Sequence, residues 1–111
     1  MQMKPISVEI PGRNKLEKSY GQYLATLKRA GEIIDYRYEP FSLRIGHSAW
    51  YKPDFLVVKD DCFELHETKG FMREAANVRL KACATKYPWF RFLLIQQIKG
   101  QWNVKEIKTE V

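Results

Sequence analysis

Residues 53–69 read PDFLVVKDDCFELHETK, and this stretch decides how the chain folds. Two strand-like runs flank the polar letters KDD, so the pattern predicts a β-hairpin. Asp54 opens the first run, and Glu67 and Lys69 lie two residues apart near the end of the second. Because side chains alternate along a strand, Glu67 and Lys69 share a face. Folding the hairpin then brings Asp54 beside them, although 13 residues separate Asp54 from Glu67.

The chain before the hairpin begins with a predicted helix. Asn14 is a suitable N-cap, with Glu17 three residues later as in a capping box. Apolar residues then recur at helical spacing as far as Ala30, and Gly31 is a suitable C-terminal stop. Glu17 lies at the edge of the apolar stripe, so its carboxylate can lean over the sheet while the helix stays docked.

The remaining segments predict a mixed sheet. A near-continuous apolar run at 90–95 is typical of a strand covered on both faces, and a helix is expected at 72–87. A right-handed crossover through that helix makes strand 90–95 parallel to a central strand. Alternation and turn signals place the other strands and one loop, at 33–38, 41–45, 55–58, 62–69 and 102–107, with the loop at 46–50.

The fold class that follows is α/β, with a mixed β-sheet flanked by helices and a core order of α-β-β-β-α-β. The whole chain, 1–111, is expected to form one domain, since 111 residues with 45% hydrophobic content suffice for one core. No apolar run is long enough to cross a membrane, and no secretory signal is recognised. Cys62 and Cys83 are expected to be buried thiols in a reducing cytoplasm.

The charged residues of the hairpin predict a metal site. Two carboxylates and an ammonium at the edge of an apolar sheet are costly unless they bind something. Mg²⁺ would remove the repulsion between Asp54 and Glu67, and its open positions can take a phosphate oxygen and an attacking water. Lys69 can orient that water or stabilise charge on the phosphate. Thr68 is expected to offer only its backbone carbonyl, because its side chain faces away.

Several polar residues have two interpretations. Glu17 is either a helix cap or a further group that holds a metal or positions a water. The net charge of +6 favours a polyanionic partner, although it also serves solubility. Basic and polar side chains on the two helices either contact DNA phosphates or form solvated faces; they are Arg13, Lys15 and Lys18 around Glu17, and Arg73, Asn77 and Lys81 on the second helix.

With these residues in place, the chain resembles the PD-(D/E)xK nuclease superfamily, and especially its small phage-encoded members. The resemblance covers roughly residues 14–96, and the order of helix, hairpin, helix and strand agrees with it. The matching motifs are Asn14-Lys15-Leu16-Glu17, Ala30 to Ile33, Tyr51 to Phe55, His66 to Gly70 and Tyr87-Pro88.

The resemblance implies a restriction-endonuclease-like fold and a metal-dependent endonuclease that acts on DNA. By family role, Asp54 and Glu67 would bind Mg²⁺, for which Mn²⁺ substitutes, Lys69 would assist the water, and Glu17 would complete the metal site. Small phage members are similar to Holliday junction resolvases, which cut branched DNA as homodimers during recombination, repair or processing. The alternatives are a nicking or single-strand nuclease, and a DNA-binding module without turnover.

Overall fold

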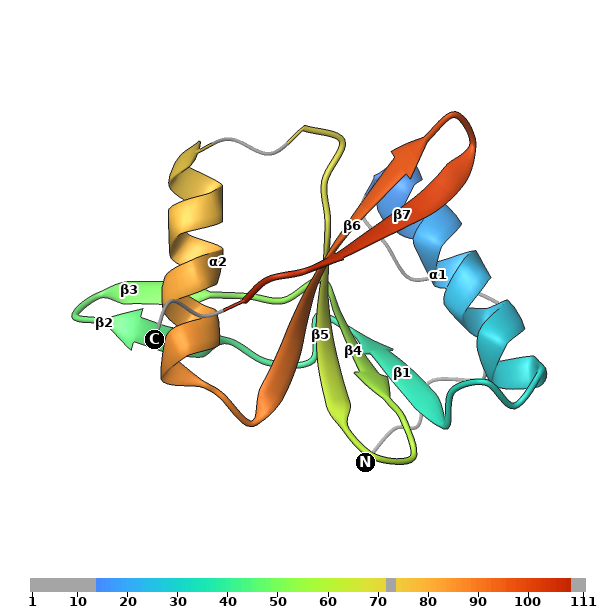
Figure 1. Ribbon diagram of the computed structural model, residues 1–111, viewed down its shortest axis with the longest axis horizontal. Helices are drawn as coiled ribbons and strands as arrows, with labels where there is room; N and C mark the ends of the chain where they lie inside the picture. The colour runs from blue at the N-terminus through green and yellow to red at the C-terminus, as the bar shows by residue number, and fades with distance from the viewer. Residues whose placement is uncertain (1–13, 72–73, 109–111) are drawn as a thin grey trace, which may run out of the picture.

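The computed structural model describes residues 14–71 and 74–108 (Figure 1). Two helices and seven strands form in this part of the chain, in the order α1 (Lys15–Arg29), β1 (Asp35–Tyr38), β2 (Leu43–Gly46), β3 (Ala49–Tyr51), β4 (Phe55–Val58), β5 (Phe63–Thr68), α2 (Glu74–Lys86), β6 (Phe90–Ile98) and β7 (Gln101–Glu106). None of the helices described is both long and apolar enough to span a bilayer.

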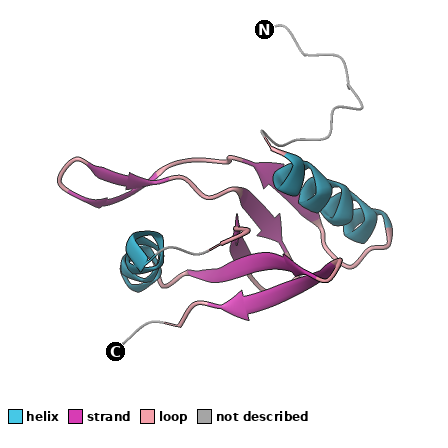
Figure 2. Ribbon diagram, turned by 90° about the horizontal axis from the view of Figure 1, so that it is seen from above, coloured by secondary structure: helices cyan, strands magenta, loops and turns pink. Residues whose placement is uncertain are grey.

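Five strands form one mixed sheet in the order β1-β4-β5-β6-β7, and β2 and β3 form a separate hairpin. Strands β5 and β6 are parallel, and the other neighbours in the sheet are antiparallel. The two helices lie on opposite sides of the sheet (Figures 1 and 2). The predicted α/β class and the parallel pairing across the α2 crossover are therefore confirmed.

The sheet separates two apolar cores. Phe55 and Val57 of β4 pack on the α1 side with Leu24, and all three are fully buried. Leu65 and Phe92 pack on the α2 side with Leu80 and Cys83. Because β6 is buried from Phe92 to Ile95, it contributes side chains to both cores. Each large apolar side chain buried in this way stabilises the fold by roughly 1.5–3 kcal/mol.

Helix α1 begins and ends where its sequence predicts. The Asn14 side chain accepts a 2.8 Å hydrogen bond from the Glu17 backbone N–H, which satisfies one of the free donors of the first turn. At the other end, Gly31 adopts a φ of +77°, and its N–H bonds the carbonyl of Lys28. Glycine reaches this left-handed conformation without strain, so the chain can turn from α1 toward β1.

Two local predictions are wrong. The predicted loop 46–50 contains the start of β3, which pairs with β2 from Gly46↔Ala49 onward. Its two-residue turn includes Ser48 at a φ of +56°, a position where the usual signal is glycine or asparagine. Cys62 was expected to be a buried thiol but is only partly buried, because it lies just before β5 in the turn of the hairpin, whereas Cys83 is buried as expected.

Candidate functional site

The hairpin of β4 and β5 brings Asp54 to the end of β5. The register pairs Phe55 with His66, so Asp54 precedes β4 where Glu67 follows on β5. Asp54 Oδ2 accepts hydrogen bonds from the Thr68 backbone N–H at 2.8 Å and from the Thr68 hydroxyl at 3.0 Å. The predicted approach of these segments is therefore present, and two donors fix the orientation of the Asp54 carboxylate.

Thr68 corrects a detail of the sequence interpretation. Its side chain was expected to face away from the cluster, but its hydroxyl bonds Asp54. The reason is that Asp54 lies just outside β4, where strict alternation of side chains no longer holds. Thr68 thus holds Asp54 through its side chain and its backbone N–H.

Glu67 is held by one tyrosine and one lysine. Its Oε2 accepts a 2.5 Å hydrogen bond from the Tyr51 hydroxyl, and its Oε1 lies 3.4 Å from Lys69 Nζ. Glu67 is only 7% exposed, whereas the Lys69 side chain is 40% exposed. The carboxylate is therefore rigidly placed, and the ammonium can move without breaking the core.

Both carboxyls of the cluster have raised pKa values. Burial, followed by the charge of Asp54, raises the pKa of Glu67 to about 7, although Tyr51 and Lys69 act in the opposite direction. Burial also raises the pKa of Asp54, with the charge of Glu17 as a further cause and the bonds from Thr68 opposing it. The Lys69 ammonium lowers the pKa of both carboxyls but does not reverse their shifts. The cluster is therefore short of positive charge.

Glu17 lies next to this cluster and also caps its helix. Its Oε1 accepts a 2.6 Å hydrogen bond from the Tyr38 hydroxyl, and its Oε2 accepts one of 2.7 Å from Asn14. Across residues 14–71 and 74–108, however, no three His, Cys, Asp or Glu side chains converge closely enough to hold a metal ion. The prediction that Glu17 completes a metal site stays a prediction, and Asp54 and Glu67 are the pair available for direct contact with a cation.

The donor set of this pair fits a hard divalent cation. Both Thr68 bonds go to Oδ2 of Asp54, and no residue that the structure describes donates to its Oδ1. Mg²⁺ is usually bound through one or two carboxylates and keeps several waters. Asp54 Oδ1 and Glu67 Oε1 supply two such oxygens, and a cation between them would stabilise the ionised forms that burial disfavours in both groups.

Sequence reasoning missed Arg79 of α2. A small cavity of about 50 Å³ is lined by side chains from three elements, namely Tyr51, Glu67, Lys69, Ala76, Arg79 and Leu80. Arg79 is an exposed cation at this cavity, one helical turn after Ala76. The signal was its helical spacing, because Arg79 follows Ala76 by three residues and precedes the buried Cys83 by four.

The structure describes four of the six predicted DNA contacts. Lys15, Lys18 and Lys81 are exposed, and Asn77 is partly buried. Lys15 and Lys18 flank Glu17 in the first turn of α1, so they lie at the same end of the sheet as the cluster. Arg13 and Arg73 fall outside the described residues.

A second buried polar group occupies the opposite face of β5. His66 Nδ1 lies 2.6 Å from the Tyr20 hydroxyl, and His66 Nε2 lies 3.0 Å from Glu64 Oε1. Glu64 Oε2 is 3.2 Å from Arg91 and 3.6 Å from Lys59. His66 faces away from Glu67, because its partner Tyr20 belongs to the core on the α1 side.

Burial and the neighbouring charges set the protonation states of His66 and Glu64. Burial and the nearby Lys59 and Arg91 charges lower the pKa of His66, so the ring is neutral at pH 7. Burial alone would raise the pKa of Glu64, but the His66 hydrogen bond and the two cations outweigh it and lower that pKa. The ionised Glu64 then accepts from Nε2–H, which leaves Nδ1 to accept from the Tyr20 hydroxyl.

No protein-family model, curated protein or solved structure matches this chain.

Proposed function

We propose that this protein is a metal-dependent endodeoxyribonuclease with a restriction-endonuclease-like PD-(D/E)xK domain. The observation that carries the proposal is the meeting of Asp54, Glu67 and Lys69 where the ends of the β4–β5 hairpin come together. These are the groups that hydrolysis of a phosphodiester needs: oxygens for a cation and a mobile ammonium beside them.

In this proposal Asp54, Glu67 and the Thr68 carbonyl would hold Mg²⁺ or Mn²⁺. The bound ion would polarise a phosphate oxygen and lower the pKa of a water. The Thr68 donors and the Tyr51 hydroxyl keep the two carboxylates oriented. Lys69 Nζ, 3.4 Å from Glu67, moves toward the water or the phosphate and stabilises the charge that develops there.

The substrate we propose is branched DNA, of the Holliday junction kind, processed during phage recombination, repair or DNA processing. The net charge of +6 supports a polyanionic partner. Residues 14–71 and 74–108 contain one such cluster, so a two-fold homodimer would present two clusters to the two strands at a branch point.

Cleavage assays test this function. Labelled branched, flapped and linear DNA are incubated with the protein and Mg²⁺, Mn²⁺ or EDTA. Asp54→Asn and Lys69→Ala should each lower the cleavage rate by on the order of 10²–10³-fold, because each removes charge that stabilises the transition state. Lys105→Ala, an exposed lysine on the far edge strand, is the matched control and should cleave normally. Full activity in Asp54→Asn or Lys69→Ala would contradict the assigned roles.

One observation favours a second candidate, a DNA-binding module without turnover. The described residues offer two carboxylates rather than a cluster of three metal-binding side chains. Tight binding that falls steeply with salt, ignores divalent metal and gives no cleavage product would support this candidate. Cutting of single strands or nicking of duplexes without preference for branches would instead identify a nuclease of another specificity.

A further inference from the structure

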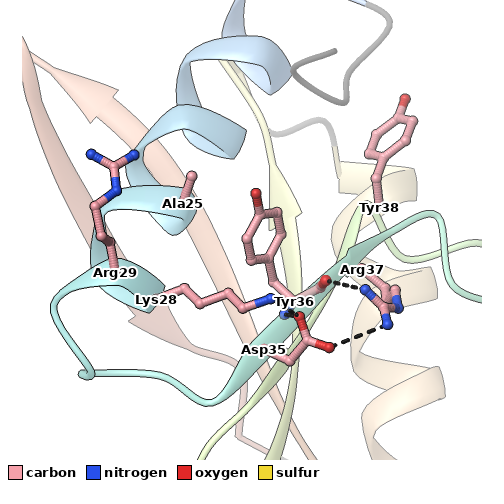
Figure 3. A pocket seen from close by; sticks show the side chains of 7 residues that line it. All are labelled: Ala25, Lys28, Arg29, Asp35, Tyr36, Arg37 and Tyr38. Atoms are coloured by element: carbon pink, nitrogen blue, oxygen red, sulfur yellow. Dashed lines mark hydrogen bonds and ion pairs between the residues drawn. The ribbon is translucent and has the colours of Figure 1, made fainter. Parts of the chain in front are cut away.

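A groove of about 570 Å³ runs along the outer edge of β1, beside the last turns of α1 (Figure 3). Lys28 and Arg29 line it from the helix, and the four residues of β1, 35–38, line it from the strand. Strand β1 is an edge of the five-stranded sheet, so its outer side has no strand neighbour in that sheet. No residue of this groove belongs to the DNA contacts predicted from the sequence.

The groove carries more positive than negative charge. Lys28 and Arg37 reach Asp35 from two sides, at 3.0 and 3.3 Å (Figure 3). Arg29 has no ion pair with any residue in the described part of the chain, so three cations face one carboxylate. The Lys28 and Arg37 side chains are 49% and 68% exposed, which leaves donors of both available to phosphate oxygens.

Aromatic rings accompany these charges. Tyr36 and Tyr38 leave the same side of β1, where they pack against the α1-side core and stay partly exposed (Figure 3). A ring offers stacking to an unpaired base, whereas paired bases within a duplex are closed to it. A basic track with interleaved aromatic rings is the arrangement that binds single-stranded nucleic acid.

The groove leads to the candidate site. Tyr38, at one end of the groove, donates to Glu17 at 2.6 Å, and the next residue, Glu39, bonds the Asp54 carbonyl through its N–H at 2.8 Å. A strand lying along β1 toward Tyr38 would therefore approach the Asp54 cluster.

We propose that this groove binds the sugar-phosphate backbone of an unpaired DNA strand, such as the free arm of a branched substrate. Its phosphates pair with Lys28, Arg29 and Arg37, and its bases stack on Tyr36 and Tyr38. The direction of the strand toward Asp54 rests on the proposed nuclease function, but the binding itself does not.

Binding in EDTA tests the groove without cleavage. Fluorescence anisotropy is measured with labelled oligothymidylate and with a duplex of equal length, over a range of salt. The double variant Arg29→Ala/Arg37→Ala should bind oligothymidylate on the order of tenfold more weakly at 0.1 M salt, because two phosphate contacts are lost. Each phosphate contact with a single strand contributes about 0.7 to the slope of log K against log salt, so the magnitude of this slope should fall by about 1.4.

A matched control separates the groove from net charge. Lys105→Ala/Lys108→Ala removes the same two charges from exposed positions at the opposite end of the sheet order. This control should leave oligothymidylate affinity within about twofold, and Arg29→Lys/Arg37→Lys should retain most of it, since charge is kept. The groove proposal is overturned if the two alanine pairs lose the same affinity for oligothymidylate. It is also overturned if the arginine pair loses as much affinity for the duplex as for the single strand.

The two proposals fail in different ways. Binding in EDTA reports on the groove without cleavage, and cleavage in Mg²⁺ reports on the nuclease. A wild type that never cleaves, but whose single-strand binding depends on Arg29 and Arg37, supports the groove and contradicts only the nuclease. A wild type that cleaves, with binding unaffected by the arginine pair, contradicts only the groove.

Discussion

Glu64 and Glu67 are three residues apart on the same strand, and both are almost fully buried, at 1% and 7% exposure. Their surroundings differ in charge. Glu64 accepts from His66 and has Arg91 and Lys59 within 3.6 Å, and its pKa is lowered despite its burial. Burial and the like charge of Asp54 raise the pKa of Glu67 to about 7.

This difference distinguishes a buried carboxylate with cationic partners from one that we propose to be functional. Buried charges are tolerated when they are paired and hydrogen-bonded, as Glu64 is. A buried carboxylate beside another carboxylate, with one mobile ammonium, is costly to the protein alone, and such groups gather at functional sites. We infer that the Glu64 group stabilises the fold, and that the Glu67 group becomes favourable when a cation joins it.

The sharpest test of this comparison is the pH dependence of the metal-free protein. Folding raises the pKa of Glu67 from 4.5 to about 7, so between these pH values the folded protein keeps a proton that the unfolded chain has lost. The contribution of Glu67 to the free energy of unfolding therefore falls as the pH rises from 4.5 to about 7. The loss is on the order of 3 kcal/mol and is complete above pH 7. Urea unfolding in EDTA between pH 4.5 and 8 should show that Glu67→Gln is less sensitive to pH than the wild type.

Added Mg²⁺ supplies the control for that measurement. It should stabilise the wild type at pH 7.5 and leave Glu67→Gln nearly unchanged, since only the wild type retains both carboxylates. A constant difference between the two proteins at every pH, with or without Mg²⁺, would contradict the charge conflict.

Glu64→Gln should show the opposite dependence of stability on pH. Because the pKa of Glu64 is lowered in the folded state, its contribution is fully present above the unfolded pKa of about 4.5 and is lost as pH falls below that value. The variant should therefore be destabilised by about 2 kcal/mol at pH 7, the value of hydrogen bonds to a charged group, and by much less in acid. Urea unfolding measures it, and a stabilised Glu64→Gln at pH 7 would remove the distinction between the two groups.

The smallest effects come from the two tyrosine hydroxyls. Tyr20→Phe removes a hydrogen bond to neutral His66, and Tyr51→Phe removes one to Glu67. Each should cost about 1 kcal/mol. The cost of Tyr51→Phe should grow as pH rises past 7, where Glu67 is ionised, while that of Tyr20→Phe stays level above pH 7. Thermal unfolding of both variants at pH 6 and pH 8.5 compares them, and identical pH dependence would show that the hydroxyls serve equivalent partners.

The sequence predicted the parts of this site that depend on local pattern. Alternation and a short turn were enough to bring Asp54 to Glu67 and Lys69, and the Asn14 cap predicted where α1 begins. The parts that it missed depend on how distant elements dock. Tyr51 reaches Glu67 only because β3 ends beside the sheet, and the parallel register of β5 and β6 sets Arg91 opposite Glu64.

The turn between β2 and β3 was not predicted for a different reason. Ser48 takes a left-handed φ without being glycine, so the sequence carries no strong hairpin signal there. Arg79 likewise looks like any exposed helical arginine until α2 is placed against the cluster.

The odd spacing of Glu64 and Glu67 also protects the hairpin from slipping. Three residues put the two carboxylates on opposite faces of β5, where separate sets of partners receive them. Sliding β5 by a single position against β4 would turn each carboxylate toward the wrong side and press it into hydrocarbon. Misaligned pairing is thus penalised twice, and the alignment that assembles the candidate site is also the one the folding chain can least easily replace.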